Sequence, residues 1–208
     1  MGFLDRIRAL FADDPETAGA ESYFGEMPAV ETPRLILRKA RTGDAEDIYA
    51  YSKDPEVARH VLWTAHGSIG DSRAYIRYLQ SQYRNGEPGS YVIERKADRR
   101  VIGTVGWMNV TPEHYSAEIG YSIARDCWNQ GIMTEALACM LRISFESLGL
   151  NRVYGYYELD NPASRRVMEK CGMTQEGILR QSVYNKGRFS DTGLCAIVRS
   201  DWLHLSER

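Results

Sequence analysis

Apolar residues recur with two different periods along this chain of 208 residues, and these periods divide it into helices and strands. Across residues 134–148 the apolar positions are three or four residues apart, which predicts a helix with one buried face. This face carries Leu137, Met140, Leu141, Ser144, Phe145 and Leu148, and Gly149 is placed to end the helix. Residues 90–95, 101–110 and 115–124 predict three strands, because β-branched and aromatic residues there lie between turn-forming sequences.

The remaining segments predict further elements on both sides of this region. They are a strand at 34–39, helices at 42–52, 54–61 and 70–86, a strand at 152–159, a helix at 161–172, and strands around 181–184 and 192–199. In the helix at 161–172, Asn161 is the N-cap, Pro162 the first helical residue and Gly172 the terminator. This order predicts a mixed α/β (α+β) domain with a mostly antiparallel sheet, flanked by helices, and one β-α-β crossover.

Residues 1–30 differ in composition from the remainder of the chain. A short apolar stripe is followed by an acidic stretch that contains Gly, Ala and Pro, and residues 1–31 hold seven acidic side chains against two arginines. We interpret 1–30 as an appendage, a short amphipathic helix with an acidic tether, and 31–208 as the folded domain. The stripe has too few basic residues for anionic lipid. It therefore favours packing on its own domain or on a second subunit, as in a homodimer. The stripe consists of Phe3, Leu4, Ile7, Leu10 and Phe11.

Composition excludes several classes of protein. A net charge of −2 gives no electrostatic basis for binding nucleic acid. No apolar run approaches the ~20 residues that a membrane helix needs, and Asp5, Arg6 and Arg8 interrupt the apolar N-terminus, so we expect no membrane association and no signal peptide. The four cysteines lack the spacing of a metal site. We therefore predict no metal, reduced buried thiols and a cytoplasmic protein.

The segment Gln130-Gly131-Ile132-Met133-Thr134 begins a strongly apolar helix on a turn that contains glycine. The first four amides of a helix have no partner within the helix, and together with the helix dipole they form an anion site suited to phosphate. Glycine at position 131 removes a Cβ and permits close approach to the backbone. A tight turn with hydrated amides is the alternative. The patterns of a Walker phosphate loop and of a dinucleotide-binding loop are both absent.

A second helix start, at Asn161, follows the next strand, so both starts are expected at the same edge of the sheet. Read together, "EIGYSIARDCWNQGIMTEAL" and "NPASRRVMEKCGM" resemble the GNAT superfamily of acyl-CoA-dependent N-acetyltransferases. The likeness is greatest to its ribosomal-protein N-terminal (alanine/serine) acetyltransferase branch, which "ETPRLILRKARTGDAEDIYAYSKDPEVARHV" also resembles. The resemblance covers about residues 31–200. It implies a GNAT fold whose sheet is splayed at the acyl-CoA site, with acetyl-CoA as co-substrate.

The resemblance also implies which residues bind the cofactor. The backbone of Ile119, Gly120, Tyr121, Ser122 and Ile123 is expected to pair with the pantetheine arm of coenzyme A. The amides of Gln130, Gly131, Ile132, Met133 and Thr134 are expected to hold the pyrophosphate, with Asn161 and Ser164 beside the thioester. Trp128 and Met133 depart from the side chains that are usual in this loop. This difference should have little effect on pyrophosphate binding, because the backbone amides and not the side chains make the contacts.

Acetyl transfer needs a neutral amine, stabilisation of an oxyanion, and a donor for the departing thiolate. We assign Glu118 as base, acting through water, because strand alternation can point it to the acceptor side; a solvent-facing glutamate is the alternative. Ser164 matches the serine of the ribosomal branch and is assigned to the sulfur, unless it bonds its own backbone. Met168 stands where many members have tyrosine. Ser182 and Val183 replace an acidic position, which puts a ribosomal substrate in doubt.

Other polar residues carry weaker assignments. Trp63 and His66 lie where the resemblance implies a cover over the acceptor pocket, although a surface loop explains them equally well. His60 and His114 are interpreted as partly exposed polar residues, and Glu135 as a residue that compensates the helix dipole. Arg125, Arg165 and Arg166 could reach phosphates, but solvated faces explain them more simply. The chain is thus predicted to be an N-acetyltransferase for a peptide N-terminus or a small-molecule amine; the alternative is a non-catalytic acyl-CoA sensor.

Overall fold

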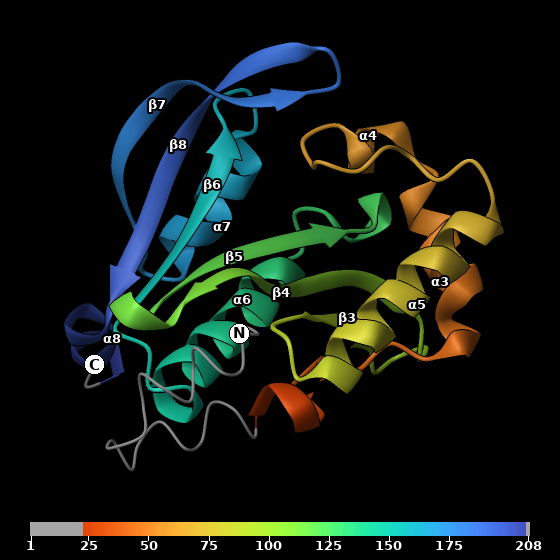
Figure 1. The fold of residues 1–208 in the computed structure, drawn as a ribbon, viewed down its shortest axis with the longest axis horizontal. Coiled ribbons are helices and arrows are strands. Elements are labelled where there is room, and N and C mark those ends of the chain that lie inside the picture. The colour runs from red at the N-terminus through yellow and green to blue at the C-terminus, as the bar shows by residue number, and fades with distance from the viewer. Residues whose placement is uncertain (1–22, 207–208) are drawn as a thin grey trace.

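The computed structural model describes residues 23–206. Within this range one sheet runs in the order β1-β2-β3-β4-β5-β6-β8-β7 (Figure 1). All neighbouring strands are antiparallel except β5 and β6, which are parallel. The strands are β1 (Val30–Glu31), β2 (Leu35–Arg38), β3 (Ser90–Arg95), β4 (Val101–Thr111), β5 (Ser116–Ile123), β6 (Arg152–Glu158), β7 (Thr174–Asn185) and β8 (Arg188–Val198). The predicted mixed α/β class with a mostly antiparallel sheet is confirmed.

Helices cover both faces of the sheet. They are α3 (Ala45–Ser52), α4 (Pro55–Ala58), α5 (Ile69–Asn85), α6 (Ile132–Arg142), α7 (Pro162–Lys170) and α8 (Arg199–Ser206). On β4, the hydroxyl of Thr104 lies near the phenols of Tyr51 on α3 and Tyr75 on α5. Three residues further, Trp107 donates its Nε1–H to Ser144 just after α6, at 3.0 Å. Because side chains alternate along a strand, α3 and α5 lie on one face of the sheet and α6 on the other.

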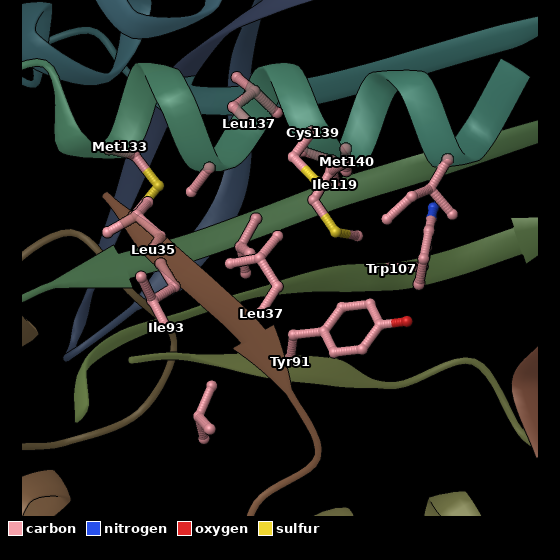
Figure 2. Packing of buried hydrophobic residues seen from close by; sticks show 14 of the residues in the cluster. Leu35, Leu37, Tyr91, Ile93, Trp107, Ile119, Met133, Leu137, Cys139 and Met140 are labelled. Atoms are coloured by element: carbon pink, nitrogen blue, oxygen red, sulfur yellow. The ribbon is translucent and has the colours of Figure 1, made fainter. Parts of the chain in front are cut away.

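The largest part of the core lies between α6 and strands β2 to β5 (Figure 2). The predicted apolar face of the helix is buried along its whole length. Met133 and Met140 point toward the sheet, on the side where β2 carries Leu35 and Leu37. The α-helix passes into a π-helical turn at Ile143–Ser147 and ends at Gly149, whose φ of +63° explains why glycine stands there. A buried aliphatic or methionine side chain contributes roughly 1.5–3 kcal/mol, so this interface anchors α6.

The parallel pair β5–β6 is joined only at its beginning. Ser116, Ala117 and Glu118 pair with Arg152, Val153 and Tyr154, and the ladder then stops, although both strands continue. On its other edge β5 stays paired with β4 as far as Ile123. The two strands therefore separate after Glu118 and leave one backbone edge of β5 without a strand partner. This is the splay that the family resemblance implied.

Three parts of the chain differ from the expected elements. Strands β7 and β8 are longer than expected, since β7 is exposed along most of its length and lacks the alternation that marks a half-buried strand. Helix α8 was not predicted. Phe24 and Met27, within the predicted appendage, are buried in the core, so the expected boundary at residue 30 falls inside a packed segment. The apolar stripe at 3–11 lies outside the described residues. Among residues 23–206, no helix is long and apolar enough to cross a membrane.

Candidate active site

The start of α6 is an open helix N-terminus. Gly131 is the N-cap, with φ +70°, and no side chain caps the helix. Asn129, two residues earlier, also has positive φ. The amides of the first turn therefore have no intrahelical acceptor, and a Cβ at Gly131 would meet only the Arg34 guanidinium, at 3.7 Å. This bare turn fits the pyrophosphate of a nucleotide cofactor, because the donors and the positive end of the helix dipole face the same space.

Hydrogen bonds from residues just before β2 hold this turn in place. Glu135, in the first turn of α6, accepts hydrogen bonds from the Thr32 hydroxyl at 2.6 Å and from the Arg34 amide at 2.9 Å. The Arg34 guanidinium bonds Glu135 at 2.5 Å and donates to the carbonyl of Gln130 at 2.9 Å. Burial acts to raise the pKa of Glu135, but these hydrogen bonds outweigh it and the pKa is lowered. Glu135 therefore stays ionised and ties the turn to a segment a hundred residues away.

Glu118 stands at the point where β5 and β6 separate. It is the last residue of β5 paired with β6, opposite Tyr154, and on the other side it pairs with Asn109. Ser122, four residues on, meets the hydroxyl of Thr104 at 3.3 Å and so faces α3 and α5. By alternation Glu118 faces the same way. Burial raises the pKa of its carboxyl above the ordinary value, which is the direction that suits a general base.

The opposite face of β5 meets the start of α7. Asn161 caps α7 by accepting the amide of Ser164 at 3.2 Å, an interaction worth about 1 kcal/mol. The phenol oxygen of Tyr121 lies 3.0 Å from the Ser164 hydroxyl and 3.1 Å from the Ser164 carbonyl oxygen. Burial raises the pKa of Tyr121 well above its usual range. The structure thus brings the predicted residues Asn161, Ser164 and Tyr121 together across the gap.

Met168 lies further along α7, where the resemblance led us to look for a tyrosine. Its side chain is 1% exposed. A Cβ built on Gly155 of β6 would come within 3.1 Å of the Met168 sulfur and 3.3 Å of the Ile119 carbonyl oxygen. The thioether therefore fills the closed end of the gap, and glycine at 155 is needed for this close approach. A thioether has no proton to donate.

A buried carboxylate links the end of β6 to the loop after α4. Glu158, 5% exposed, accepts from Arg188 at 2.8 Å and contacts His60 Nδ1 at 3.0 Å. Asp160 lies 3.5 Å from both His60 and Arg188. His60, Glu158 and Asp160 are close enough together to hold a metal ion. However, the Arg188 guanidinium already pairs with both carboxylates, so we interpret the cluster as an ion-pair network.

The turn of the β7–β8 hairpin is attached to the same loop (Figure 1). Lys186 donates to the carbonyls of Ala58 at 2.8 Å and Val61 at 2.5 Å. Between the loop, the hairpin and the end of β6 lies a cavity of about 550 Å³. It is lined by Pro55, Ala58, Arg59, Thr64, Ala65, Asp160, Asn185, Lys186 and Arg188. Asp160 immediately precedes the α7 cap, so the cavity adjoins the residues assigned to the thioester.

Trp63 and His66, the residues predicted to bind the acceptor, are next in sequence to residues that line this cavity. Trp63 packs partly against the core, and its ring lies 5.6 Å from that of His66. His66 Nδ1 contacts the Ser72 hydroxyl at 2.8 Å, and burial lowers the pKa of the imidazole. Between them, Thr64 and Ala65 line the cavity. Trp63 and His66 themselves are not among the lining residues.

The sequence does not reveal contacts between side chains that are far apart along the chain. Glu158 and His60 are 98 positions apart, and the Thr32–Glu135 contact spans 103 positions. The family resemblance implies a role only for the backbone of Tyr121, and no neighbouring residue in the sequence indicates that its hydroxyl has a partner on α7. All four cysteines are free and buried, as expected. Of the arginines considered for phosphate, Arg165 pairs with Glu169 on an exposed face.

Comparison with known proteins agrees with this geometry. The chain matches the family profile of the acetyltransferase (GNAT) domain over residues 34–174. It is 35% identical to the uncharacterized N-acetyltransferase YoaA of Bacillus subtilis (strain 168), over 83% of this chain and 98% of that protein. It is 26% identical to the spermidine N(1)-acetyltransferase of Vibrio cholerae, over 84% and 98%. The chain belongs to the GNAT family and is an N-acetyltransferase.

A solved structure with bound cofactor has the same fold. It is that of RimL, described as a ribosomal L7/L12 alpha-N-protein acetyltransferase in complex with coenzyme A. It superposes with a TM-score of 0.74 at 20% identity, over 82% of this chain and 98% of that chain. At this identity the likeness concerns the fold.

Proposed function

We propose that this enzyme transfers an acetyl group from acetyl-CoA to a primary amine by direct attack in a ternary complex. The acceptor is a peptide or protein N-terminus, or a small-molecule amine. One observation carries the proposal. At the gap between β5 and β6, the Glu118 carboxylate lies on one face of β5 and the Tyr121–Ser164 pair on the other. A base and a leaving-group donor on opposite faces fit an amine and a thioester that meet in the gap.

The cofactor assignment rests on backbone groups. The amides of Gln130, Gly131, Ile132, Met133 and Thr134 are assigned to the pyrophosphate, because the turn is uncapped and Gly131 leaves it open. The edge of β5 that lacks a partner is assigned to the pantetheine amides, since a strand edge pairs readily with another extended chain. This edge comprises Ile119, Gly120, Tyr121, Ser122 and Ile123. Asn161, as the α7 cap, positions Ser164 near the thioester.

The chemistry follows from these positions. Glu118 accepts the proton of the attacking amine through a water molecule, and its raised pKa strengthens it as a base. A backbone N–H of Ile119 to Tyr121 stabilises the oxyanion of the tetrahedral intermediate, because such donors are fixed before the reaction begins. Ser164 donates a hydrogen bond to the sulfur as the carbon–sulfur bond breaks. No metal has a part in this scheme.

The cavity beside Asp160 is assigned to the acceptor. Its lining includes three cationic side chains, Arg59, Lys186 and Arg188, against the carboxylate of Asp160 and that of the adjoining Glu158, which is bound to Arg188, so one positive charge remains in excess. This balance favours a peptide N-terminus or an amine that also carries an anionic group. It disfavours a polyamine such as the one in the name of the Vibrio cholerae relative, because polycations are bound by clustered carboxylates.

A panel of acceptors tests the proposal. Release of free thiol from acetyl-CoA is measured with acidic, neutral and basic peptides of free N-terminus, with amino acids and with spermidine. We expect turnover with peptides or anionic amines and little with spermidine. The rival function is an acyl-CoA sensor, and the proton-less Met168 in the gap favours it. Tight binding of acetyl-CoA without thiol release for any amine would establish the sensor and reject the enzyme mechanism.

A further inference from the structure

The hydroxyl of Ser164 is not free in this fold. Tyr121 projects from β5 across the gap, and its phenol oxygen lies 3.0 Å from the Ser164 Oγ and 3.1 Å from the Ser164 carbonyl oxygen. The two residues are 43 positions apart, Tyr121 on β5 and Ser164 in the first turn of α7. Any role of Ser164 toward a sulfur atom must therefore include Tyr121.

The contacts on α7 restrict the orientation of Ser164 further. Its amide is held by the Asn161 side chain, so its position in the first turn is fixed. Met168, one turn later, fills the closed end of the gap and offers no hydrogen-bond donor. Among the side chains assigned to this face of the gap, Tyr121 and Ser164 carry hydroxyl groups, and these two hydroxyls lie 3.0 Å apart, so one can polarise the other as it donates to a leaving thiolate.

We propose that Tyr121 is a positioning residue, which orients the Ser164 hydroxyl toward the sulfur of the departing coenzyme A thiol. The proposal rests on the role of Ser164 given in the proposed function. Before reaction the phenol shares its hydrogen with the Ser164 carbonyl oxygen, and the serine hydroxyl donates to the phenol oxygen. As negative charge develops on sulfur, the phenol donates to Ser164 Oγ and the serine hydrogen turns to the sulfur.

The step is balanced without another reactant. The carbon–sulfur bond breaks, its electron pair passes to sulfur, and the carbonyl of the new amide re-forms. The proton lost by the amine passes by way of water to Glu118. The thiolate takes a proton from solvent as it leaves. Tyr121 keeps its proton throughout, because burial raises the pKa of the phenol and makes a tyrosinate costly.

Two linked donors stabilise a thiolate better than a lone serine. A donor that itself receives a hydrogen bond is polarised and becomes a stronger donor. Removal of the phenol oxygen alone should therefore weaken the effect of Ser164 without abolishing it. Tyr121→Phe keeps the ring that packs against the core, so the fold should be preserved.

The test compares Tyr121→Phe, Ser164→Ala and the double variant in the full-length protein. We expect kcat to fall about tenfold in Tyr121→Phe and on the order of 10²-fold in Ser164→Ala. The double variant should be no slower than Ser164→Ala, because one residue acts through the other. The Kd for acetyl-CoA should stay within about twofold throughout. Tyr78→Phe, on the exposed face of α5, is the matched control and should be unchanged.

A spectroscopic titration separates this role from a structural one. Coenzyme A is bound to each protein, and the ultraviolet absorbance of its thiolate is followed with pH. In the wild-type protein the thiol should ionise at lower pH than free coenzyme A. That shift should shrink in Tyr121→Phe and disappear in Ser164→Ala. A packing defect would lower thermal stability but would leave the ionisation of the bound thiol where it was.

Three results would overturn the inference: a normal kcat in Tyr121→Phe, losses that multiply in the double variant, or an unchanged thiol titration. Each leaves the proposed function intact as long as Ser164→Ala remains slow. A normal kcat in Ser164→Ala would instead remove the role of Ser164 from the proposed function. The two failures are therefore distinguishable within one set of proteins.

Discussion

The two sides of the active site are built from different kinds of group. The α6–α7 side, formed by β5 and the starts of α6 and α7, offers mainly backbone: an uncapped helix turn at Gly131 and a strand edge beyond Glu118. The hairpin side, formed by the loop after α4, Glu158 and the β7–β8 turn, consists of side chains. Its centre is the buried Glu158, which contacts His60 and the half-exposed Arg188, and Lys186 ties the hairpin turn to the loop.

This difference assigns the two tasks of the enzyme to different sides: the backbone side binds the cofactor, and the side-chain side recognises the acceptor. Binding by backbone amides depends little on which side chains the loop carries. Trp128 and Met133 can therefore replace the usual residues of the loop with little loss of cofactor affinity. The hairpin side depends on the identity and charge of each residue, which makes it the place where acceptors are distinguished. Substitutions on the first side should therefore affect cofactor binding, and those on the second side acceptor recognition.

The largest effect is expected at Gly131. Gly131→Glu puts bulk and negative charge at the pyrophosphate position and should abolish binding of acetyl-CoA. At 100 times Kd, ligand raises the wild-type Tm by about 5–10 °C, and the variant should lose this shift. Gly131→Asn is the matched control, since asparagine tolerates positive φ, as Asn129 does nearby. A full ligand shift in the glutamate variant would exclude this turn as the site.

Substitution of Glu118 tests whether the gap between β5 and β6 contains a catalytic base in addition to the cofactor site. Glu118→Gln should lower kcat on the order of 10²-fold and remove the rise of activity with pH as the carboxyl ionises. Its pKa is raised in the folded protein, so the native state holds the proton more tightly and loses stability as pH rises through that pKa. The variant should thus match or exceed the wild-type Tm at neutral pH. Exposed Glu113→Gln serves as control, and an unaltered pH profile in Glu118→Gln would argue against the base.

A smaller effect is expected on the hairpin side. Lys186→Ala removes the hydrogen bonds to Ala58 and Val61, which should loosen the loop and raise the acceptor KM by about 3–10-fold, the effect of losing roughly 1 kcal/mol of hydrogen bonding. The Kd for acetyl-CoA should not change. Lys170→Ala, at the exposed end of α7, provides the comparison. If Lys186→Ala weakened cofactor binding instead, the division between the two sides would be wrong.

The smallest effect on activity is expected from the N-terminal segment, which we propose acts in assembly or acceptor access. Deletion of residues 1–22 should leave kcat within about threefold and change either the oligomeric mass or the acceptor KM. Deletion of 1–30 also removes Phe24 and Met27 from the core and should cost roughly 3–6 kcal/mol of stability. Light scattering, kinetics and thermal unfolding measure these outcomes. A folded 1–22 deletion that binds acetyl-CoA but is inactive would assign this segment to the active site.

Much of the fold could be read from local sequence. The apolar period of residues 134–148 predicted α6 and its buried face, and Asn161-Pro162 marked the start of α7 at the correct residue. Helix α8 and the full length of β7 escaped prediction. The exposed strand β7 lacks the alternation on which a strand prediction depends. The segment 23–30 resembles a tether in sequence because its apolar residues, which include the buried Phe24 and Met27, follow neither a helical nor a strand period.

By itself the sequence determined most of the elements, their order and the family to which the chain belongs. Those follow from periodicity, capping residues and short motifs, each contained within about twenty positions. Only the tertiary structure decided which side chains meet: Tyr121 with Ser164, Glu158 with His60 and Arg188, and Thr32 and Arg34 with Glu135. The physical reason is range. A hydrogen bond acts over about 3 Å in space whatever the separation along the chain, and the partners of these groups lie 30 to 103 residues away.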